Sequence, residues 1–192
     1  MLTNLNILLG VTGGVAAYKA VDLASKLAAA GANVQTVMTE NARRFIGPVS
    51  FEAVTRSNVH TSMWNPPEGY KIGHIALADW SDIIIVAPAS ANIIGKIANG
   101  ICDDLLSTIL CACWPLIKSG TVLLAPAMNN NMWENPAVQK NIETVKKMGF
   151  QLTGPAEGRL ACGTKGLGRM SEPQEILEVI EKIASKISKN KP

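Results

Sequence analysis

The sequence predicts an α/β fold in which a mostly parallel sheet is flanked by helices. Strand-like apolar runs alternate with helical patterns along the chain, which is typical of right-handed βαβ units. Two of these runs, Asp82–Ala87 and Thr121–Ala125, consist almost entirely of apolar residues, as in strands buried on both faces. The 192 residues contain no internal repeat or low-complexity linker and match the size of one domain. We therefore expect residues 1–192 to form a single domain with a three-layer, Rossmann-like arrangement.

The first half of the chain is predicted to form two strand–helix units. Asn6–Val11 is a short apolar run that ends at a glycine-rich turn. Val15–Ala30 follows with leucines on one face and charged residues on the other, and Gly31 is a stop signal for this helix. Asn33–Met38 is expected to be the next strand, and Pro48–Thr55 the next helix.

The second half continues the alternation, with helices between and after the two buried strands. Helices are expected at Ile93–Ala98, at Leu105–Cys113 and from Pro136, capped by Asn135, to the stop at Gly149. Phe150–Thr153 is expected to be the last strand. A terminal helix is indicated by apolar residues at helical spacing from Ile176 to Ile187, and a flexible basic tail is expected from about residue 188.

The composition excludes several classes of protein. Hydrophobic residues make up 47% of the chain and charged residues only 17%, against a typical ~25%, which excludes a disordered chain. Four cysteines are too few for a disulfide-stabilised scaffold. Because charge is scarce and the mean hydropathy is +0.17, we expect another subunit to cover part of the apolar surface.

The distribution of charge and hydropathy indicates a cytoplasmic protein with reduced thiols. The net charge is +3, but no basic stripe is interleaved with aromatic residues, so no nucleic-acid partner is expected. No apolar run approaches the ~20 residues that a membrane span needs, so no membrane partner is expected either. Met1 leads into a strand-like run without a basic segment, which argues against a signal peptide.

The turn after the first predicted strand has the composition of an anion site. Adjacent Gly13 and Gly14 at the start of a helix allow backbone N–H groups to approach a phosphate, and we favour this interpretation over a plain tight turn. The spacing matches neither the dinucleotide nor the P-loop motif. At the end of the second strand Thr39 suits a phosphate or a flavin edge and Glu40 suits a ribose, so this turn leaves the ligand open.

Two further turns after buried strands are more polar than a connection requires. Ser90 and Asn92 offer hydrogen bonds to a ligand, although a role as helix N-cap is equally compatible with the pattern. The second turn runs from Pro126 to Trp133 and contains three successive asparagines and two methionines. Asparagine amides can hold a carboxylate or a flavin edge, and Met and Trp side chains can form the wall for a flat ligand.

The histidines and most cysteines have structural roles when they are considered singly. A histidine such as His74 is more often structural than catalytic, and His60 has no companion residues of interest. Two histidines without a Cys-x-x-Cys pair are too few for a zinc centre, so no metal is expected. Cys102, Cys111 and Cys113 are expected to be buried thiols.

Cys162 differs because it lies in Gly158–Met170, a glycine-rich segment with three cations. Glycines can act as hinges for a lid, and neighbouring cations can lower the pKa of a thiol. A nucleophilic cysteine would need a partnered base, whereas a general acid needs only reach and a suitable pKa.

Four motifs in order, together with the Cys162 segment, resemble the homo-oligomeric flavin-containing Cys decarboxylases. The motifs are Gly-Gly-Val-Ala-Ala-Tyr-Lys from Gly13, His74 ahead of Ala-Asp-Trp, Pro-Ala-Ser-Ala-Asn from Pro88, and Pro-x-Met-Asn-x-x-Met-Trp from Pro126. The segment Ala161-Cys-Gly to Gly168-Arg-Met is similar to the substrate-covering flap of members that decarboxylate phosphopantothenoylcysteine in coenzyme A biosynthesis. The resemblance extends from Asn6 to about Ile187.

The resemblance implies a cofactor, a reaction and a set of site residues. It implies FMN bound by Gly13, Gly14, Val15, Thr39, Ser90, Asn92 and Ala127. It implies catalysis by His74 and Cys162, and a substrate site that contains Asn129, Ala161, Met132 and Arg169. In the family, FMN oxidises the cysteinyl thiol to a thioaldehyde, CO₂ is lost, and the enethiolate is reduced again with a proton from the flap cysteine.

The resemblance also implies a homotrimer or a dodecamer of trimers, in which one subunit contributes residues to the site of the next. It leaves open whether the chain is a stand-alone decarboxylase or the amino-terminal part of a bifunctional decarboxylase/synthetase. A flavin prenyltransferase, a peptidyl-cysteine decarboxylase and a non-catalytic regulator remain as alternatives. A prenyltransferase would not need His74 or the Cys162 flap, a peptidyl-cysteine decarboxylase would not be expected to carry that flap, and a regulator should have lost a catalytic residue.

Overall fold

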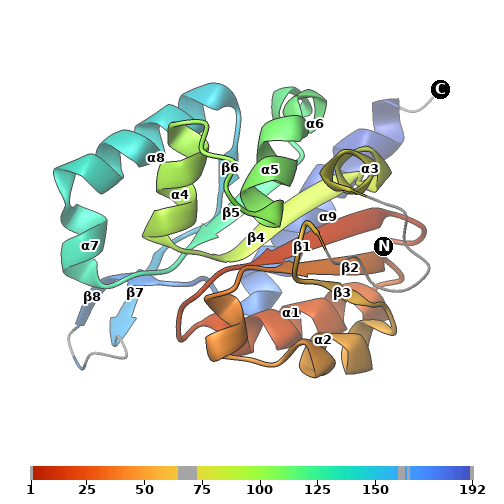
Figure 1. Ribbon diagram of the computed structural model, residues 1–192, viewed down its shortest axis with the longest axis horizontal. Helices are drawn as coiled ribbons and strands as arrows, with labels where there is room; N and C mark the ends of the chain where they lie inside the picture. The colour runs from red at the N-terminus through yellow and green to blue at the C-terminus, as the bar shows by residue number, and fades with distance from the viewer. Residues whose placement is uncertain (1, 65–72, 160–162, 164, 191–192) are drawn as a thin grey trace.

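A six-stranded parallel sheet forms the centre of the molecule, in the order β3-β2-β1-β4-β5-β6 (Figure 1). The computed structural model describes residues 2–64, 73–159, 163 and 165–190. The strands are β1 (Asn6–Val11), β2 (Asn33–Met38), β3 (Val59–His60), β4 (Ile83–Ala89), β5 (Val122–Pro126) and β6 (Gln151–Leu152). All five neighbouring pairs are parallel, which confirms the predicted fold class.

Helices cover both faces of this sheet and make it the middle of three layers. α1 (Ala17–Ala29), α2 (Pro48–Thr55) and α9 (Pro173–Asn190) cover one face (Figure 1). The other face carries α3 (His74–Trp80), α4 (Ala91–Ala98), α5 (Leu105–Ala112), α6 (Trp114–Ser119) and α8 (Pro136–Met148). Strand β1 supplies both cores by alternation: Ile7 and Leu9 belong to the core on the α1 side, whereas Leu8 between them belongs to the core on the α5 side.

The order of the sheet reverses between β1 and β4, and this places the turns that follow them side by side. The chain moves outward from β1 to β2 and β3, then returns to pair β4 with the other edge of β1. Ligands of open α/β sheets bind at such a switch point, beyond the carboxyl ends of the strands.

A second sheet corrects the prediction for the end of the chain. β7 (Ala156–Arg159) and β8 (Lys165–Arg169) form an antiparallel hairpin, so Phe150–Thr153 does not contain the last strand, and Gly158–Met170 includes the end of β7 and all of β8. Ala161 and Cys162 themselves lie outside the described residues. Gly168 has φ +145°, and a Cβ there would clash with the carbonyl oxygen of Met128. The glycines that indicated a loop thus permit close packing of a strand.

Several other expectations need correction. Cys113 is buried, but Cys102 and Cys111 are exposed, because Cys102 lies between two helices and Cys111 lies on the outer side of α5. Helix α9 continues to Asn190, beyond the start of the tail that we expected to be flexible. No helix in the described part of the chain is both long enough and apolar enough to cross a membrane.

His60 is a buried structural residue in β3, as its isolation in the sequence predicted. Its ring Nε2 lies 3.0 Å from Oε1 of Gln35 on β2, and only 2% of the residue is exposed. Burial lowers the pKa of His60 below its ordinary value of 6.5, because the charged imidazolium is poorly solvated there.

This pKa shift predicts a loss of stability in mild acid. Below about pH 6.5 the unfolded chain binds a proton at His60 that the folded chain resists, so the free energy of unfolding falls as the pH falls. Urea unfolding at pH 7.5 and pH 5.5 should show a smaller fall for His60→Gln, which cannot titrate, than for the wild type. An equal fall in both proteins would contradict the assignment.

Candidate functional site

A large cavity opens at the carboxyl ends of β1, β2, β4 and β5, where the order of the sheet reverses. Its volume is about 1200 Å³, above the ~300–1000 Å³ typical of a pocket for one small ligand. The predicted site residues that line it are Gly13, Gly14, Val15, Thr39, Ser90, Asn92, Ala127, Asn129, Met132 and Arg169. Glu40, the alternative ribose ligand, lines it too. Segments that are distant in the sequence therefore meet in one place.

The hydroxyl of Thr12 joins two of these segments. Thr12 Oγ1 donates to the carbonyl oxygen of Pro88 at 2.7 Å and accepts from the backbone N–H of Ser90 at 3.0 Å. Thr12 is only 2% exposed, so both bonds are shielded from water. They hold the Gly13–Gly14 turn against the turn that begins α4.

The glycine turn presents the start of α1 to the cavity. Ala16 is the N-cap of α1 and makes no side-chain capping bond; the N–H groups of Ala17 and Lys19 donate to the carbonyls of Gly14 and Ala16, so a bound anion would be favoured mainly by the helix dipole. A Cβ on Gly13 would lie 2.5 Å from Cβ of Asn41, whereas one on Gly14 would meet nothing within 4 Å. Gly13 is therefore required by packing against the chain itself, and Gly14 leaves its backbone open to a ligand.

Ser90 combines the two roles that its position suggested. Its Oγ accepts from the N–H of Ile93 at 3.4 Å and caps α4, and the residue also lines the cavity. The next turn packs against it, because the N–H of Ala127 donates to the carbonyl of Ala89 at 3.1 Å. Asn92 and Ala127 are thereby brought to neighbouring positions on the cavity wall.

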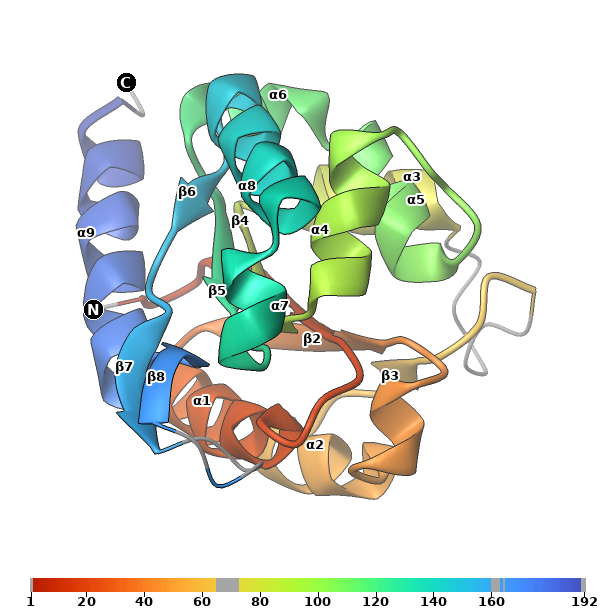
Figure 2. The same ribbon diagram turned by 90° about the vertical axis from the view of Figure 1, so that its left-hand side faces the viewer.

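Asn129 is held as the N-cap of the short helix α7 (Asn130–Glu134). Its Oδ1 accepts from the N–H of Asn131 at 2.8 Å, which orients the amide group. The preceding residue, Met128, donates its N–H to the carbonyl of Gly168 in β8 at 2.9 Å. The β7–β8 hairpin is thus bound to the turn after β5, and Figure 2 shows it between α7 and α9.

A charged cluster lies where the hairpin approaches α1. Glu172 accepts from Lys19 Nζ at 2.8 Å and also pairs with the guanidinium of Arg169. These hydrogen bonds, first from Lys19 and then from Arg169, lower the pKa of Glu172. All three residues line the cavity, so two cations and one carboxylate face a ligand there.

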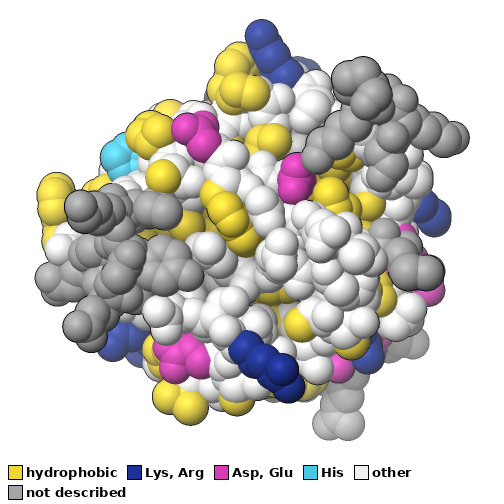
Figure 3. Space-filling model, turned by 90° about the vertical axis from the view of Figure 1, so that its right-hand side faces the viewer, with side chains coloured by type: hydrophobic (Ala, Val, Ile, Leu, Met, Phe, Trp, Pro, Cys, Tyr) yellow, Lys and Arg dark blue, Asp and Glu magenta, His cyan; other side chains and the backbone are white. Residues whose placement is uncertain are grey.

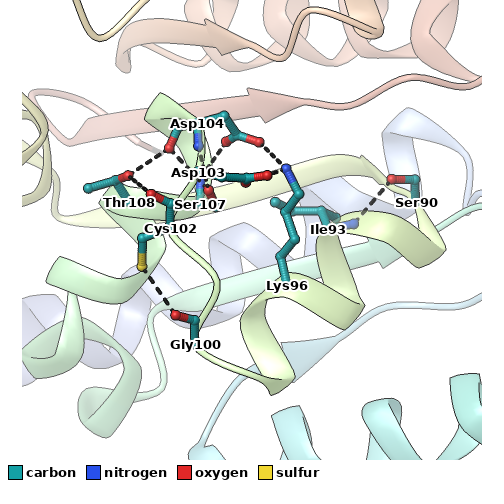
Figure 4. A network of polar contacts seen from close by, with 9 residues as sticks. All are labelled: Ser90, Ile93, Lys96, Gly100, Cys102, Asp103, Asp104, Ser107 and Thr108. Carbon is teal, nitrogen blue, oxygen red and sulfur yellow. Dashed lines mark hydrogen bonds and ion pairs between the residues drawn. The ribbon is translucent and has the colours of Figure 1, made fainter.

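A second lysine of the cavity wall is held by two carboxylates. Lys96 Nζ lies 2.6 Å from Asp103 Oδ1 and 2.6 Å from Asp104 Oδ2 (Figure 4). Burial alone would lower the pKa of Lys96, but the hydrogen bonds to both carboxylates outweigh it and raise that pKa. Asp104 also caps α5 through Ser107, so Lys96 joins α4 to the start of α5.

His74 is not brought to this cavity within one chain. It is the first residue of α3, is partly exposed, and is not among the cavity-lining residues. Ala161 and Cys162 lie outside the described residues. Among the described residues, no group of three or more His, Cys, Asp or Glu side chains is placed to hold a metal ion.

Sequence reasoning missed several residues of the cavity wall. They include Thr12, Lys19, Lys96, Asp104 and Glu172. Lys96 had a usable signal, since it lies one helical turn after Asn92 and therefore on the same face. Thr12 also had a usable signal, because it directly follows the first predicted strand and precedes two glycines. Glu172 had none, because it reaches Lys19 across 153 residues of sequence.

The Thr12 hydroxyl predicts a local effect of substitution. Thr12→Val keeps the shape but leaves the Pro88 carbonyl and the Ser90 N–H unsatisfied, which should destabilise the fold by about 1–3 kcal/mol. The Ser90 amide should then exchange its hydrogen faster. Thr12→Ser keeps the hydroxyl and serves as the control, and Ser90 should stay protected in it. Unchanged exchange in Thr12→Val would refute the role of this hydroxyl.

Comparison with known proteins places the fold and the cavity in a family. The family model described as "Flavoprotein" matches residues 1–185. The chain is 50% identical over 182 residues to the coenzyme A biosynthesis bifunctional protein CoaBC of Bacillus subtilis; the match includes 95% of this chain and 44% of that protein. The chain therefore spans less than half the length of this curated relative.

Two solved structures are similar over nearly their whole length. A PPC decarboxylase mutant complexed with pantothenoylaminoethenethiol matches with a TM-score of 0.81 and 33% identity, over 95% of this chain and 99% of that one. The FMN binding protein AtHal3 matches with a TM-score of 0.78 and 32% identity, over 95% and 98%. From the extent of these matches and of the family model, the chain belongs to the flavoprotein family.

Proposed function

We propose that this protein is an FMN-dependent carboxy-lyase that converts 4'-phospho-N-pantothenoylcysteine to 4'-phosphopantetheine in coenzyme A biosynthesis. The observation that carries the proposal is the cavity, where the residues implied for FMN and three of those implied for substrate, Asn129, Met132 and Arg169, line one space. A PPC decarboxylase and an FMN binding protein among the similar structures support it. The single domain over residues 1–192 and the cytoplasmic setting expected from the sequence belong to the same proposal.

The residues of the cavity fit FMN. Gly14 leaves its backbone open, and α1 begins without a side-chain cap, so N–H groups and the helix dipole suit a phosphate. Ser90, Asn92 and Thr39 supply polar contacts, and the volume of about 1200 Å³ leaves room for substrate beside the cofactor. The chemistry that FMN would supply is the reversible two-electron oxidation of the substrate's thiol.

The chain's own residues bind and protonate the substrate. The Asn129 amide, oriented by Asn131, has donor groups that match the substrate carboxylate, and Met132 supplies apolar contact. Lys19 and Arg169 offer positive charge for the substrate's phosphate. Cys162, between the two strands of the hairpin, is the general acid that protonates carbon in the last step, and the hairpin segment excludes water.

The proposed assembly is a homotrimer, or a dodecamer of trimers, in which His74 of one subunit completes the cavity of another. Within one chain His74 lies outside the cavity wall, which supports a site shared between copies. Large apolar side chains are exposed outside the cavity wall, including Val49 at 71% and Trp64 at 82%. Figure 3 shows hydrophobic side chains reaching the surface of one face, with acidic and basic side chains between them. Exposed apolar side chains of this size are found at subunit contacts.

The proposed reaction predicts the product that the wild type forms and the step at which each of two variants stops. Protein loaded with FMN should remove CO₂ from phosphopantothenoylcysteine, as measured by mass spectrometry of the substrate. His74→Asn should bind FMN but lose turnover by about 10²-fold or more. Cys162→Ser should release CO₂ and stop at the enethiol, because the proton donor is missing.

Controls keep this test specific. Cys111→Ser removes an exposed thiol on α5 outside the cavity wall and should turn over like the wild type. Unchanged substrate with FMN-loaded wild type would refute the proposed function. Normal product from Cys162→Ser at the wild-type rate would refute the role of Cys162 alone.

The shared site predicts complementation between inactive subunits. His74→Asn and Asn129→Ala should each be inactive alone, but their co-expression should restore activity, since some sites then combine an intact His74 with an intact Asn129 from another copy. Activity that stays at the level of the single variants would place both residues in the same chain's site. A fully active monomer on size-exclusion chromatography would contradict the assembly.

A further inference from the structure

One carboxylate oxygen on the cavity wall accepts hydrogen bonds from two cations. Lys19 Nζ, on α1, lies 2.8 Å from Oε1 of Glu172, and the guanidinium of Arg169, the last residue of β8, donates to the same oxygen. All three residues line the cavity. Two cations that converge on one point form a site for an anion, and the chain's own carboxylate occupies it here.

The cations of this cluster can bind a stronger acceptor than Glu172. Lys19 and Arg169 share one oxygen of a carboxylate that carries one negative charge. A phosphate monoester carries about two negative charges at neutral pH and three terminal oxygens, so each cation can bind an oxygen of its own. The hydrogen bonds from Lys19 and then Arg169 lower the pKa of Glu172, so its carboxylate is ionised and repels a second anion.

The Glu172 carboxylate can leave the two cations without disturbing the backbone that carries it. Its side chain is 42% exposed, whereas that of Lys19 is 12% exposed, so rotation can carry the carboxylate into solvent while the lysine stays in the wall. The Glu172 carbonyl accepts from the N–H of Ile176 at 3.0 Å, and its own N–H donates to Oε2 of Glu175 at 2.8 Å. The start of α9 is therefore held whichever way the carboxylate points.

We propose that Lys19 and Arg169 select the phosphorylated form of the substrate, and that its phosphate replaces the Glu172 carboxylate between them. The inference rests on the proposed function, which supplies a substrate with a phosphate monoester. Glu172 is then a specificity-determining residue: it keeps the cations paired in the empty site, and the phosphate competes with it for them. A ligand without the phosphate leaves the carboxylate in place.

The cluster adjoins the turn implied for the substrate. Arg169 follows Gly168, whose carbonyl accepts from the N–H of Met128, the residue directly before Asn129. Lys19, however, belongs to α1, which begins at the glycine turn implied for FMN. Because FMN carries a phosphate monoester of the same chemistry, the experiment includes a separate pair of ligands for the cofactor.

The test compares two ligands that differ only in the phosphate. FMN-loaded protein is titrated with 4'-phosphopantetheine and with pantetheine by isothermal titration calorimetry, and the ratio of their dissociation constants measures the preference for phosphate. The wild type should prefer phosphopantetheine. Lys19→Met should reduce that preference about tenfold or more, because a charge-assisted hydrogen bond is lost, and should bind pantetheine as before. Glu172→Gln should raise the preference about twofold to fivefold, because the competing charge is gone.

Matched controls separate these effects from a general change of charge. Lys26→Met removes the other lysine of α1, which pairs with Asp22 outside the cavity wall, and should keep the wild-type preference. Glu175→Gln also removes one negative charge from the start of α9, yet it keeps an oxygen that can accept from the N–H of Glu172. It should not raise the preference as Glu172→Gln does.

The cofactor's phosphate is tested by equilibrating the FMN-loaded protein with riboflavin and measuring the flavin that stays bound. Lys19→Met should retain FMN over riboflavin as the wild type does. Loss of that retention, with an unchanged preference for phosphopantetheine, would assign Lys19 to the phosphate of FMN and overturn the inference.

Two other results would overturn it. One is an equal preference for phosphopantetheine in the wild type and in Lys19→Met. The other is weaker binding of phosphopantetheine by Glu172→Gln, because the carboxylate would then support the phosphate instead of competing with it. Failure of the proposed function has a different signature, since the wild type would then bind neither compound, and the inference would fall with it.

Discussion

The buried hydroxyl of Thr12 is the contact on which the arrangement of the cavity depends. The turns after β1 and β4 lead to helices on opposite faces of the sheet, so hydrogen bonds are needed to hold the two backbones close together. Thr12 donates to Pro88 and accepts from Ser90, so a single side chain joins both turns. With this link in place, the start of α1 and the start of α4 present polar backbone and side-chain groups to the same space.

The hairpin completes the cavity from a distant part of the chain. Its strand β8 is bound to the turn after β5 through the Met128–Gly168 bond, and Glu172 beyond it is bound to Lys19 on α1. These contacts bring Gly168, Arg169 and Met170 to the cavity wall, opposite the start of α1.

The regular elements were predictable because each has a local cause. β2 and α2 match their predicted bounds, and the Asn135 cap and Gly149 stop of α8 are as expected. The errors occur where local signals conflict with packing. Glycines in β8 indicated a loop, yet Gly168 is needed for the close approach of Met128. Apolar neighbours suggested that Cys111 is buried, although only the position of α5 on the sheet decides which of its sides faces solvent.

The sequence by itself determined the parallel α/β class, the turns that carry polar residues and the family resemblance, since apolar periodicity and turn composition are local properties. Only the tertiary structure decided which of those turns meet, because the reversal of strand order at β1 and β4 brings together residues that no spacing relates. It also decided the pairing of Lys19 with Glu172 and of Lys96 with two aspartates. Such contacts depend on distances through space, which sequence separation does not encode.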